Sequence, residues 1–223
     1  MKWPDNKLIA CHESMKYKQA HPYRLNQNGA YWYSVEIVNR IRPNVDTTRD
    51  WVTINVPGLC TDHAIVFIHN NKNPNLYSWL EKYDDLVLVC GVPETCDKVA
   101  HLGKAIYLPL SIDIEYVEKF KTDVKTVERA YAGRPDKKRG TYFPPGTVYI
   151  EGKKRDIFLR ELAKCKRVYA VGRCALEAAC LGAEILPYDP RFPDPKLWKV
   201  VDNLEAAKML QKELDEIDKE KRK

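Results

Sequence analysis

Short apolar runs that alternate with helical patterns are the feature that most constrains the fold of this chain. His63–His69 (HAIVFIH) and Leu86–Cys90 (LVLVC) are continuous apolar runs of strand length. A strand that is apolar on both faces is typical of a parallel sheet covered by helices on its two sides. Helical spacing follows such runs, for example in Cys174–Leu181 and in 203–217. The sequence therefore predicts an α/β protein with parallel sheets.

The remaining elements extend this alternation through both halves of the chain. Further strands are expected at Lys7–Cys11, Trp51–Val56, Ala105–Leu110, Thr147–Ile150, Val168–Val171 and Glu184–Pro187, and further helices at 30–41, 76–83, 94–102 and 157–165. Two runs of similar length are expected to separate near Ser111–Lys125, and the charged stretch Ile114–Thr126 begins the second. This organisation predicts two small Rossmann-like, doubly wound domains, 1–113 and 114–223, with a cleft between them and a last helix that returns to the first domain.

The net charge of +6 lies in the second half of the chain. Residues 1–113 carry 12 basic and 12 acidic side chains, whereas the window Lys137–Arg167 holds 10 basic and 3 acidic ones. Such a window is either a solvated basic face or a surface that binds an anion such as a diphosphate, a nucleic acid or an anionic lipid. Tyr142, Phe143 and Tyr149 lie within it, an interleaving that suits a nucleic acid.

Composition and the amino-terminal residues predict a cytoplasmic protein without a membrane span. No apolar run approaches the ~18 residues that a membrane helix needs. The first residues, MKWPDNKLIACHE, contain no apolar stretch of leader length. Seven cysteines at irregular spacing, several within apolar runs, are typical of reduced thiols that pack as small hydrophobic groups.

The first motif is the loop Ala132–Gly140 (AGRPDKKRG), which follows an expected strand. Gly133 allows a backbone or a ligand to approach closely. Arg134, Lys138 and Arg139 supply several cationic donors within one loop, which suits a diphosphate. The alternative is a solvated basic turn.

The second motif is Val171–Asp189 (VGRCALEAACLGAEILPYD), where a strand ends at Gly172 and a helix begins at Arg173. Free N–H groups at the start of such a helix can face an anion. Glu177 is the single acid in this small, apolar helix. Its carboxylate must be solvated, paired or bound to a hydroxyl group, and we expect it to lie open in a cleft.

The third motif is the end of the apolar run at His69, in FIHNN. Reactive groups of α/β enzymes lie at the carboxyl ends of parallel strands. A histidine at this position is therefore either a catalytic residue or a side chain that completes the strand end.

These motifs, in this order, resemble those of the GT-B glycosyltransferases, in particular the retaining enzymes that use nucleotide sugars. Residues 133–140 resemble the family's GR-x4-K-G loop, and ALEAACLGAEIL resembles its segment around a ribose-binding glutamate. KAIYLPLSID resembles the strand and turn that close the family's first domain. Asn28–Gly29 resembles its donor loop, and HNN occupies the place of its histidine. The sequence departs from the family at Tyr169, where a second glutamate is usual, in the single glycine of the donor loop, and in its shorter second half.

The resemblance implies a metal-independent hexosyltransferase that takes a UDP- or GDP-sugar as co-substrate and needs no other cofactor. It implies that Gly29, Gly133, Arg134, Lys138, Arg139, Gly172 and Arg173 bind the donor, that Glu177 binds its ribose, and that His69 contacts the transferred sugar. The acceptor stays open, with a modified DNA base and a surface glycan among the candidates. The alternative function is a non-catalytic module on a trimmed GT-B scaffold that binds a nucleotide or a nucleic acid.

Overall fold

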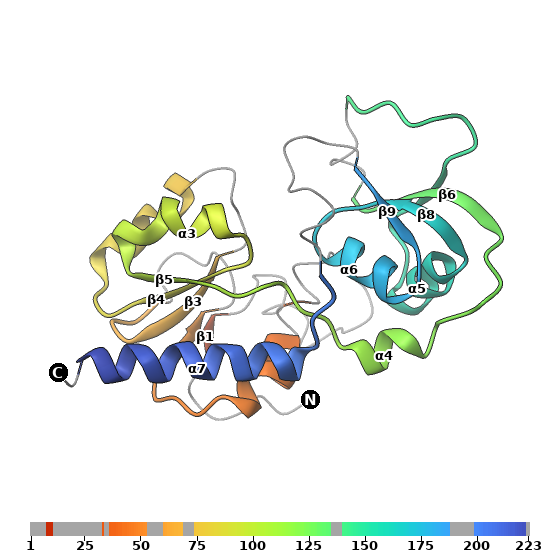
Figure 1. Ribbon diagram of the computed structural model, residues 1–223. Coiled ribbons are helices and arrows are strands. Elements are labelled where there is room, and N and C mark those ends of the chain that lie inside the picture. Colours follow the sequence, from red (N-terminus) through yellow and green to blue (C-terminus); the bar gives the residue numbers. More distant parts are fainter. Residues whose placement is uncertain are drawn as a thin grey trace. The chain divides into compact units, whose positions relative to one another are not determined.

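The computed structural model describes residues 8–10, 33, 36–52, 60–68, 74–134, 140–187 and 199–221. The chain divides into two compact units. The first takes its residues from Met1–Arg24, Ser34–Pro109 and Leu204–Lys223, and the second from Leu25–Tyr33 and Leu110–Asn203 (Figure 1). Each unit contains one sheet in which every described strand pair is parallel. The predicted α/β class with parallel sheets is therefore confirmed, and it is compatible with Rossmann-like domains.

The sheet of the first unit has the strand order β1-β2-β3-β4-β5. Its strands are β1 (Leu8–Ala10), β2 (Asp50–Val52), β3 (Ala64–Ile68), β4 (Val87–Cys90) and β5 (Lys104–Tyr107). All residues of β3 and β4 are buried, as their apolar sequences predict. The two strands pair in register from Ile65 opposite Val87 to Ile68 opposite Cys90.

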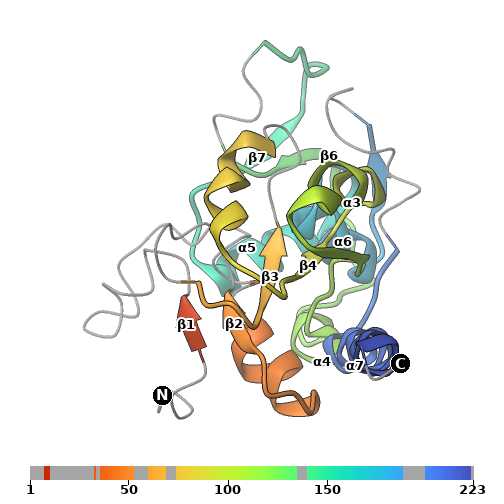
Figure 2. The same ribbon diagram turned by 90° about the vertical axis from the view of Figure 1, so that its left-hand side faces the viewer.

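Helices lie on both sides of the first sheet (Figures 1 and 2). The helical segments of this unit are η1 (Ile37–Ile41), η2 (Arg42–Asn44), η3 (Pro74–Lys82), α3 (Pro93–Val99), η4 (Ala100–Leu102) and α7 (Asn203–Lys221). Tyr77 and Leu80 of η3 and Val99 of α3 pack with Val66 and Leu88 in one core. Figure 1 shows α7 on the side of the sheet opposite to α3.

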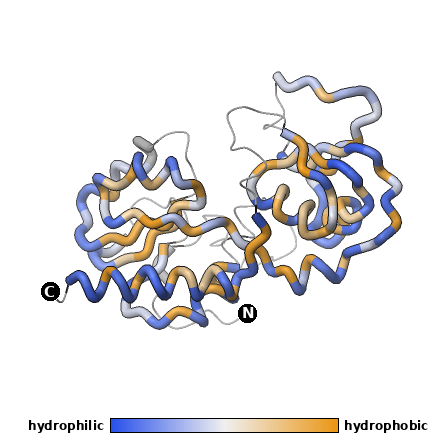
Figure 3. The backbone as a smooth tube through the Cα atoms, viewed as in Figure 1, coloured by the Kyte–Doolittle hydropathy of each residue, from blue (hydrophilic) through white to orange (hydrophobic). Residues whose placement is uncertain are grey.

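The second unit has a sheet of the order β7-β6-β8-β9. Its strands are β6 (Val127–Ala132), β7 (Val148–Ile150), β8 (Cys165–Tyr169) and β9 (Glu184–Leu186), and its helices are α4 (Ile114–Glu118), α5 (Arg155–Ala163) and α6 (Arg173–Cys180). Ala130 and Val168 of the central strands form a core with Leu159 of α5 and Leu176 of α6. The hydropathy of the chain follows this arrangement, since the strands are mostly apolar and the outer loops polar (Figure 3).

The strand order of the second unit creates a topological switch point between β6 and β8. From β6 the chain passes to β7 on one side, and it then returns across β6 to form β8 and β9 on the other side. Connections that leave in opposite directions open a crevice at the carboxyl ends of the two central strands, where α/β proteins bind ligands. The first unit shows no such reversal among its described strands.

Several elements differ from the sequence prediction in extent or type. The segment around 76–83 is a 3₁₀ helix, and Cys165 begins β8 instead of ending α5. The short helix α4 was not predicted. Asp113 caps it, because its carboxylate accepts a hydrogen bond from the backbone N–H of Tyr116 at 3.0 Å. The cap stabilises the start of a helix that the charged sequence of this stretch does not predict.

The last helix continues to Lys221, four residues beyond its predicted end at Ile217. Ion pairs extend it, since Asp218 pairs with Arg49, Glu220 with Lys104, and Lys221 with Asp85. Ion pairs with residues of the first unit therefore hold the end of α7 in place, although its charged sequence predicts that this end frays.

Candidate functional site

The candidate site lies at the carboxyl ends of β6 and β8 in the second unit. The two strands are neighbours, and Tyr131 of β6 is in register with Tyr169 of β8. The segments that follow, Gly133–Arg134 and Gly172–Arg173, therefore leave adjacent strands at the switch point. Both segments are donor-binding candidates of the sequence analysis, and the parallel register brings them to one edge of one sheet.

Gly133 is required by an internal contact. A Cβ atom at this position would lie 2.8 Å from the hydroxyl oxygen of Tyr131, which is closer than van der Waals contact permits. The Tyr131 hydroxyl donates a hydrogen bond to the carbonyl oxygen of Arg134 at 2.7 Å. Tyr131 is buried, so this bond holds the beginning of the loop against the strand end. The side chain of Arg134 is exposed.

Gly172 forms the turn between β8 and α6. Its φ of 58° and ψ of −136° lie in a region that residues with a Cβ atom hardly adopt. The carbonyl oxygen of Gly172 accepts the first hydrogen bonds of the helix, from the N–H groups of Ala175 at 2.9 Å and Leu176 at 3.2 Å. The strained turn lets α6 begin immediately after the strand, as the sequence predicts.

Glu177 lies one turn into α6 and forms two ion pairs. Its Oε1 atom accepts a hydrogen bond from Nε of Arg173 at 2.5 Å and lies 2.7 Å from Nη1 of Arg155 in the second ion pair. The side chain of Glu177 is 1% exposed, and both arginines are buried as well. The three groups carry a formal charge of +1. The expectation that this carboxylate lies open in a cleft is therefore wrong, because two arginines cover it.

Arg155 is the site residue that sequence reasoning missed. It stands at the first position of α5, and Arg173 stands at the first position of α6. A cation at a helix N-terminus opposes the helix dipole, so each arginine needs a compensating anion. An arginine at the start of a helix, together with a glutamate inside an apolar helix, is the pattern that could have signalled the pair.

The opposite ends of α5 and α6 share one cation, Lys125. Its Nζ atom donates hydrogen bonds to the carbonyl oxygens of Ala163 at 2.7 Å and Leu181 at 2.6 Å. Partial burial lowers the pKa of this ammonium group. Both helices are thus fixed at their carboxyl ends by Lys125 and at their amino ends by the ion pairs of Glu177.

Four of the predicted site residues lie outside the described part of the chain: His69, Gly29, Lys138 and Arg139. Among the residues that are described, three or more His, Cys, Asp or Glu side chains nowhere gather in a way that could hold a metal ion. The helices of the described part are all too short or too polar to cross a membrane.

Comparisons with known proteins give no match. The chain matches no protein-family model, no curated protein and no solved structure.

Proposed function

We propose that this chain is a glycosyltransferase of the GT-B type that transfers a sugar from a nucleotide-sugar donor. The supporting observation is that Gly133–Arg134 and Gly172–Arg173 leave neighbouring parallel strands at the switch point of the second sheet. In this proposal the first unit is the acceptor-side domain and the second unit the donor domain of the GT-B arrangement, with the last helix in the first unit.

The proposed mechanism follows from the charge of the leaving group. Cleavage of the bond between sugar and nucleotide develops negative charge on the diphosphate. Arg134 is exposed at the strand end, and with Lys138 and Arg139 it would bind that charge. The N–H groups at the start of α6, after Gly172, add an electropositive helix end. His69 would contact the transferred sugar, and Gly29 would belong to the donor loop.

In this proposal Glu177 first has a positioning role. Its carboxylate holds Arg155 and Arg173 at the starts of their helices, close to the proposed diphosphate position. Ribose hydroxyls would reach Glu177 only after one arginine moves away, because the carboxylate is closed to solvent. Donor binding would then include a rearrangement of this ion-paired group.

Calorimetry with UDP, GDP and their sugar conjugates tests the proposal. Arg134→Ala should weaken binding by about ten- to a hundredfold, because a hydrogen bond to a charged group contributes about 1.5–3 kcal/mol. Arg160→Ala, an exposed arginine on α5, is the matched control and should leave binding unchanged. A folded wild-type protein that binds none of these nucleotides would overturn the proposal.

A non-catalytic nucleotide-binding module is the second candidate. It is favoured by the two arginines that close Glu177 and by Tyr169 in place of the family's second glutamate. An assay of released nucleotide separates the two functions. Nucleotide binding without turnover of any nucleotide sugar would favour the module.

A further inference from the structure

The two faces of the second sheet have different coverings. Residues paired in register on parallel strands direct their side chains to the same face. Ala130, Val168 and Ile150 share one face and pack in the core with α5 and α6. Figures 1 and 2 show both helices on one side of this sheet and the segment 140–147 on the other. That segment contains no helix.

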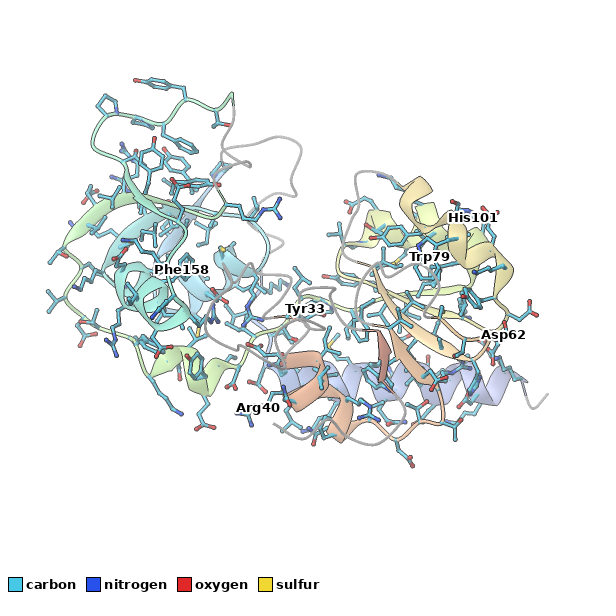
Figure 4. All side chains as sticks on the ribbon, turned by 180° about the vertical axis from the view of Figure 1, so that it is seen from behind. Tyr33, Arg40, Asp62, Trp79, His101 and Phe158 are labelled. Atoms are coloured by element: carbon cyan, nitrogen blue, oxygen red, sulfur yellow. The ribbon has the colours of Figure 1, made fainter. Side chains whose placement is uncertain are left out.

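The face opposite to the helices is aromatic. Tyr149 of β7, Tyr131 of β6 and Tyr169 of β8 are in register and form a row across three strands. Phe143 packs on this row, with its ring centroid 5.1 Å from those of both Tyr131 and Tyr169 and 6.1 Å from that of Tyr149. We call these four residues the aromatic face. By contrast, Phe158 projects from α5 on the helical side of the unit and packs against the core (Figure 4).

Part of this aromatic surface is accessible to solvent. Tyr149 is 45% exposed, and Tyr142, which precedes Phe143 in the chain, is 82% exposed. Tyr131 is buried, and its ring contacts those of Phe143 and Tyr149. Exposed aromatic groups that gather in one patch can mark a binding surface. Both exposed rings are therefore accessible for stacking, and that of Tyr149 is supported by its contacts with Tyr131 and Phe143.

The charges around the aromatic face are mainly positive. Arg129 and Arg167 form the next row of the same sheet face, two residues before Tyr131 and Tyr169 in their strands. The described strands and loops of this sheet, 127–134, 140–154, 165–169 and 184–187, carry six basic and three acidic side chains. The exposed Glu128 forms ion pairs with both Arg167 and Lys166, so these three side chains together carry a net positive charge. The complementary partner is an anion with planar groups.

We propose that the aromatic face, with Tyr142, Arg129 and Arg167, binds single-stranded nucleic acid. Unpaired bases can stack on tyrosine and phenylalanine rings, and the phosphates between them match the arginines. A duplex offers no free base faces to such a surface. A polyanion without bases would contact only the cations. This surface adjoins the proposed nucleotide-sugar site, since Tyr131 and Tyr169 stand at the strand ends that carry that site. The inference nevertheless does not depend on that function.

Fluorescence anisotropy with a labelled single-stranded oligothymidine, in wild-type and variant protein, tests the inference. The double variant Y142A/Y149A should weaken binding at least about tenfold, which corresponds to about 1.4 kcal/mol. Y142F/Y149F keeps both rings and should bind as the wild type does. Y107A is the matched control, because Tyr107 lies in the first unit and is 43% exposed.

A salt series separates the arginines from the rings. R129Q/R167Q should make the dependence of log Kd on log salt shallower by about one to two units, since each phosphate contact on a single strand contributes about 0.7. The tyrosine variants should leave that slope unchanged.

Several results would overturn the inference. One is equal binding of oligothymidine by wild type and by Y142A, a variant at a side chain too exposed to affect folding. Another is equal competition by duplex DNA or by inorganic polyphosphate, which would show contact with cations alone. Displacement of the oligonucleotide by a neutral oligosaccharide would instead assign the rings to a glycan. Circular dichroism of each variant confirms that the unit is folded.

Discussion

Glu177 in the second unit and Asp85 in the first are both carboxylates that bind several cations, but they differ in burial and position. Glu177 is 1% exposed and binds Arg155 and Arg173, both at helix starts. Asp85 is 33% exposed and binds Arg49, His63 and Lys221. Glu177 belongs to the carboxyl edge of its sheet, whereas Asp85 precedes β4 at the amino edge.

The difference shows how similar ionic chemistry serves two purposes. At the amino edge of the first sheet, the guanidinium of Arg49 is 1% exposed and donates to Asp85 and to Asp218 of α7. These contacts hold the last helix against its sheet. At the switch point of the second sheet, the ion pairs of Glu177 order two helix starts beside the proposed diphosphate site. The first cluster is structural, and the second belongs to the proposed donor site.

The largest effect is expected for Glu177→Gln. Removal of one partner of a buried ion pair leaves the other charges uncompensated and costs about 3–5 kcal/mol. Urea denaturation followed by circular dichroism measures this loss. Glu128→Gln is the matched control, because Glu128 also binds two cations but is exposed, and its replacement should change stability little. Equal stability of the two variants would contradict the buried position of Glu177.

A smaller loss is expected for Arg49→Met. The Nη1 atom of Arg49 donates to the carbonyl oxygen of Asp85 at 2.8 Å, and a buried hydrogen bond of this kind contributes about 1–3 kcal/mol. The amides of the last turn of α7 should also exchange faster with solvent. Hydrogen exchange of residues 217–221 tests this. Lys212→Met, at an exposed pair on the same helix, should not accelerate exchange.

The stability of the first unit should depend on pH through Asp85. Partial burial by itself raises the pKa of Asp85, but Lys221, His63 and Arg49 outweigh burial and lower it from 3.8 to about 2. A carboxylate with a lowered folded-state pKa contributes stability above its unfolded pKa and loses it as the pH falls. The contribution, about 1 kcal/mol after solvent screening, should therefore disappear between about pH 4 and pH 2.

Asp85→Asn isolates this pH effect from the titration of other carboxyl groups. The difference in unfolding free energy between wild type and variant should shrink as the pH is lowered through that window. A constant difference would show that Asp85 has an ordinary pKa.

The smallest effect is expected at the outermost contact of α7. Lys104 and Glu220 pair at 3.0 Å with both side chains mostly exposed, so solvent screens their attraction. Glu220→Gln should unfold within experimental error of the wild type. A clear loss would mean that exposed ion pairs also hold the helix end, and the contrast between buried and exposed clusters would weaken.

Local patterns were sufficient for many elements. The apolar runs that contain β3 and β4 predict buried strands, and the apolar stripe of 203–217 predicts the core of α7. The strand–turn–helix sequence at Gly172 predicts the start of α6, because a glycine-only backbone angle and a helix start are both properties of neighbouring residues. Helix α4 was not predicted, because the stretch is rich in charged residues and Asp113 was not recognised among them as a helix cap.

The environment of Glu177 could be predicted only in part. The sequence indicates that an acid in an apolar helix needs a partner, and Arg173 lies four residues before it on the same helix face. Arg155 belongs to another helix, and nothing in the local pattern selects it among the basic residues of its window. The burial of the whole group was likewise missed, because burial depends on how α5 packs beside α6.

By itself, then, the amino-acid sequence determined the α/β class, the parallel strands and the positions of the glycine turns, because these follow from periodicity and backbone preference over a few residues. Only the tertiary structure decided the strand order β7-β6-β8-β9, the partners of Glu177 and the row of Tyr149, Tyr131 and Tyr169. These features join residues that are distant in the chain. Their energies come from packing and charge contacts that exist only once the sheet has formed.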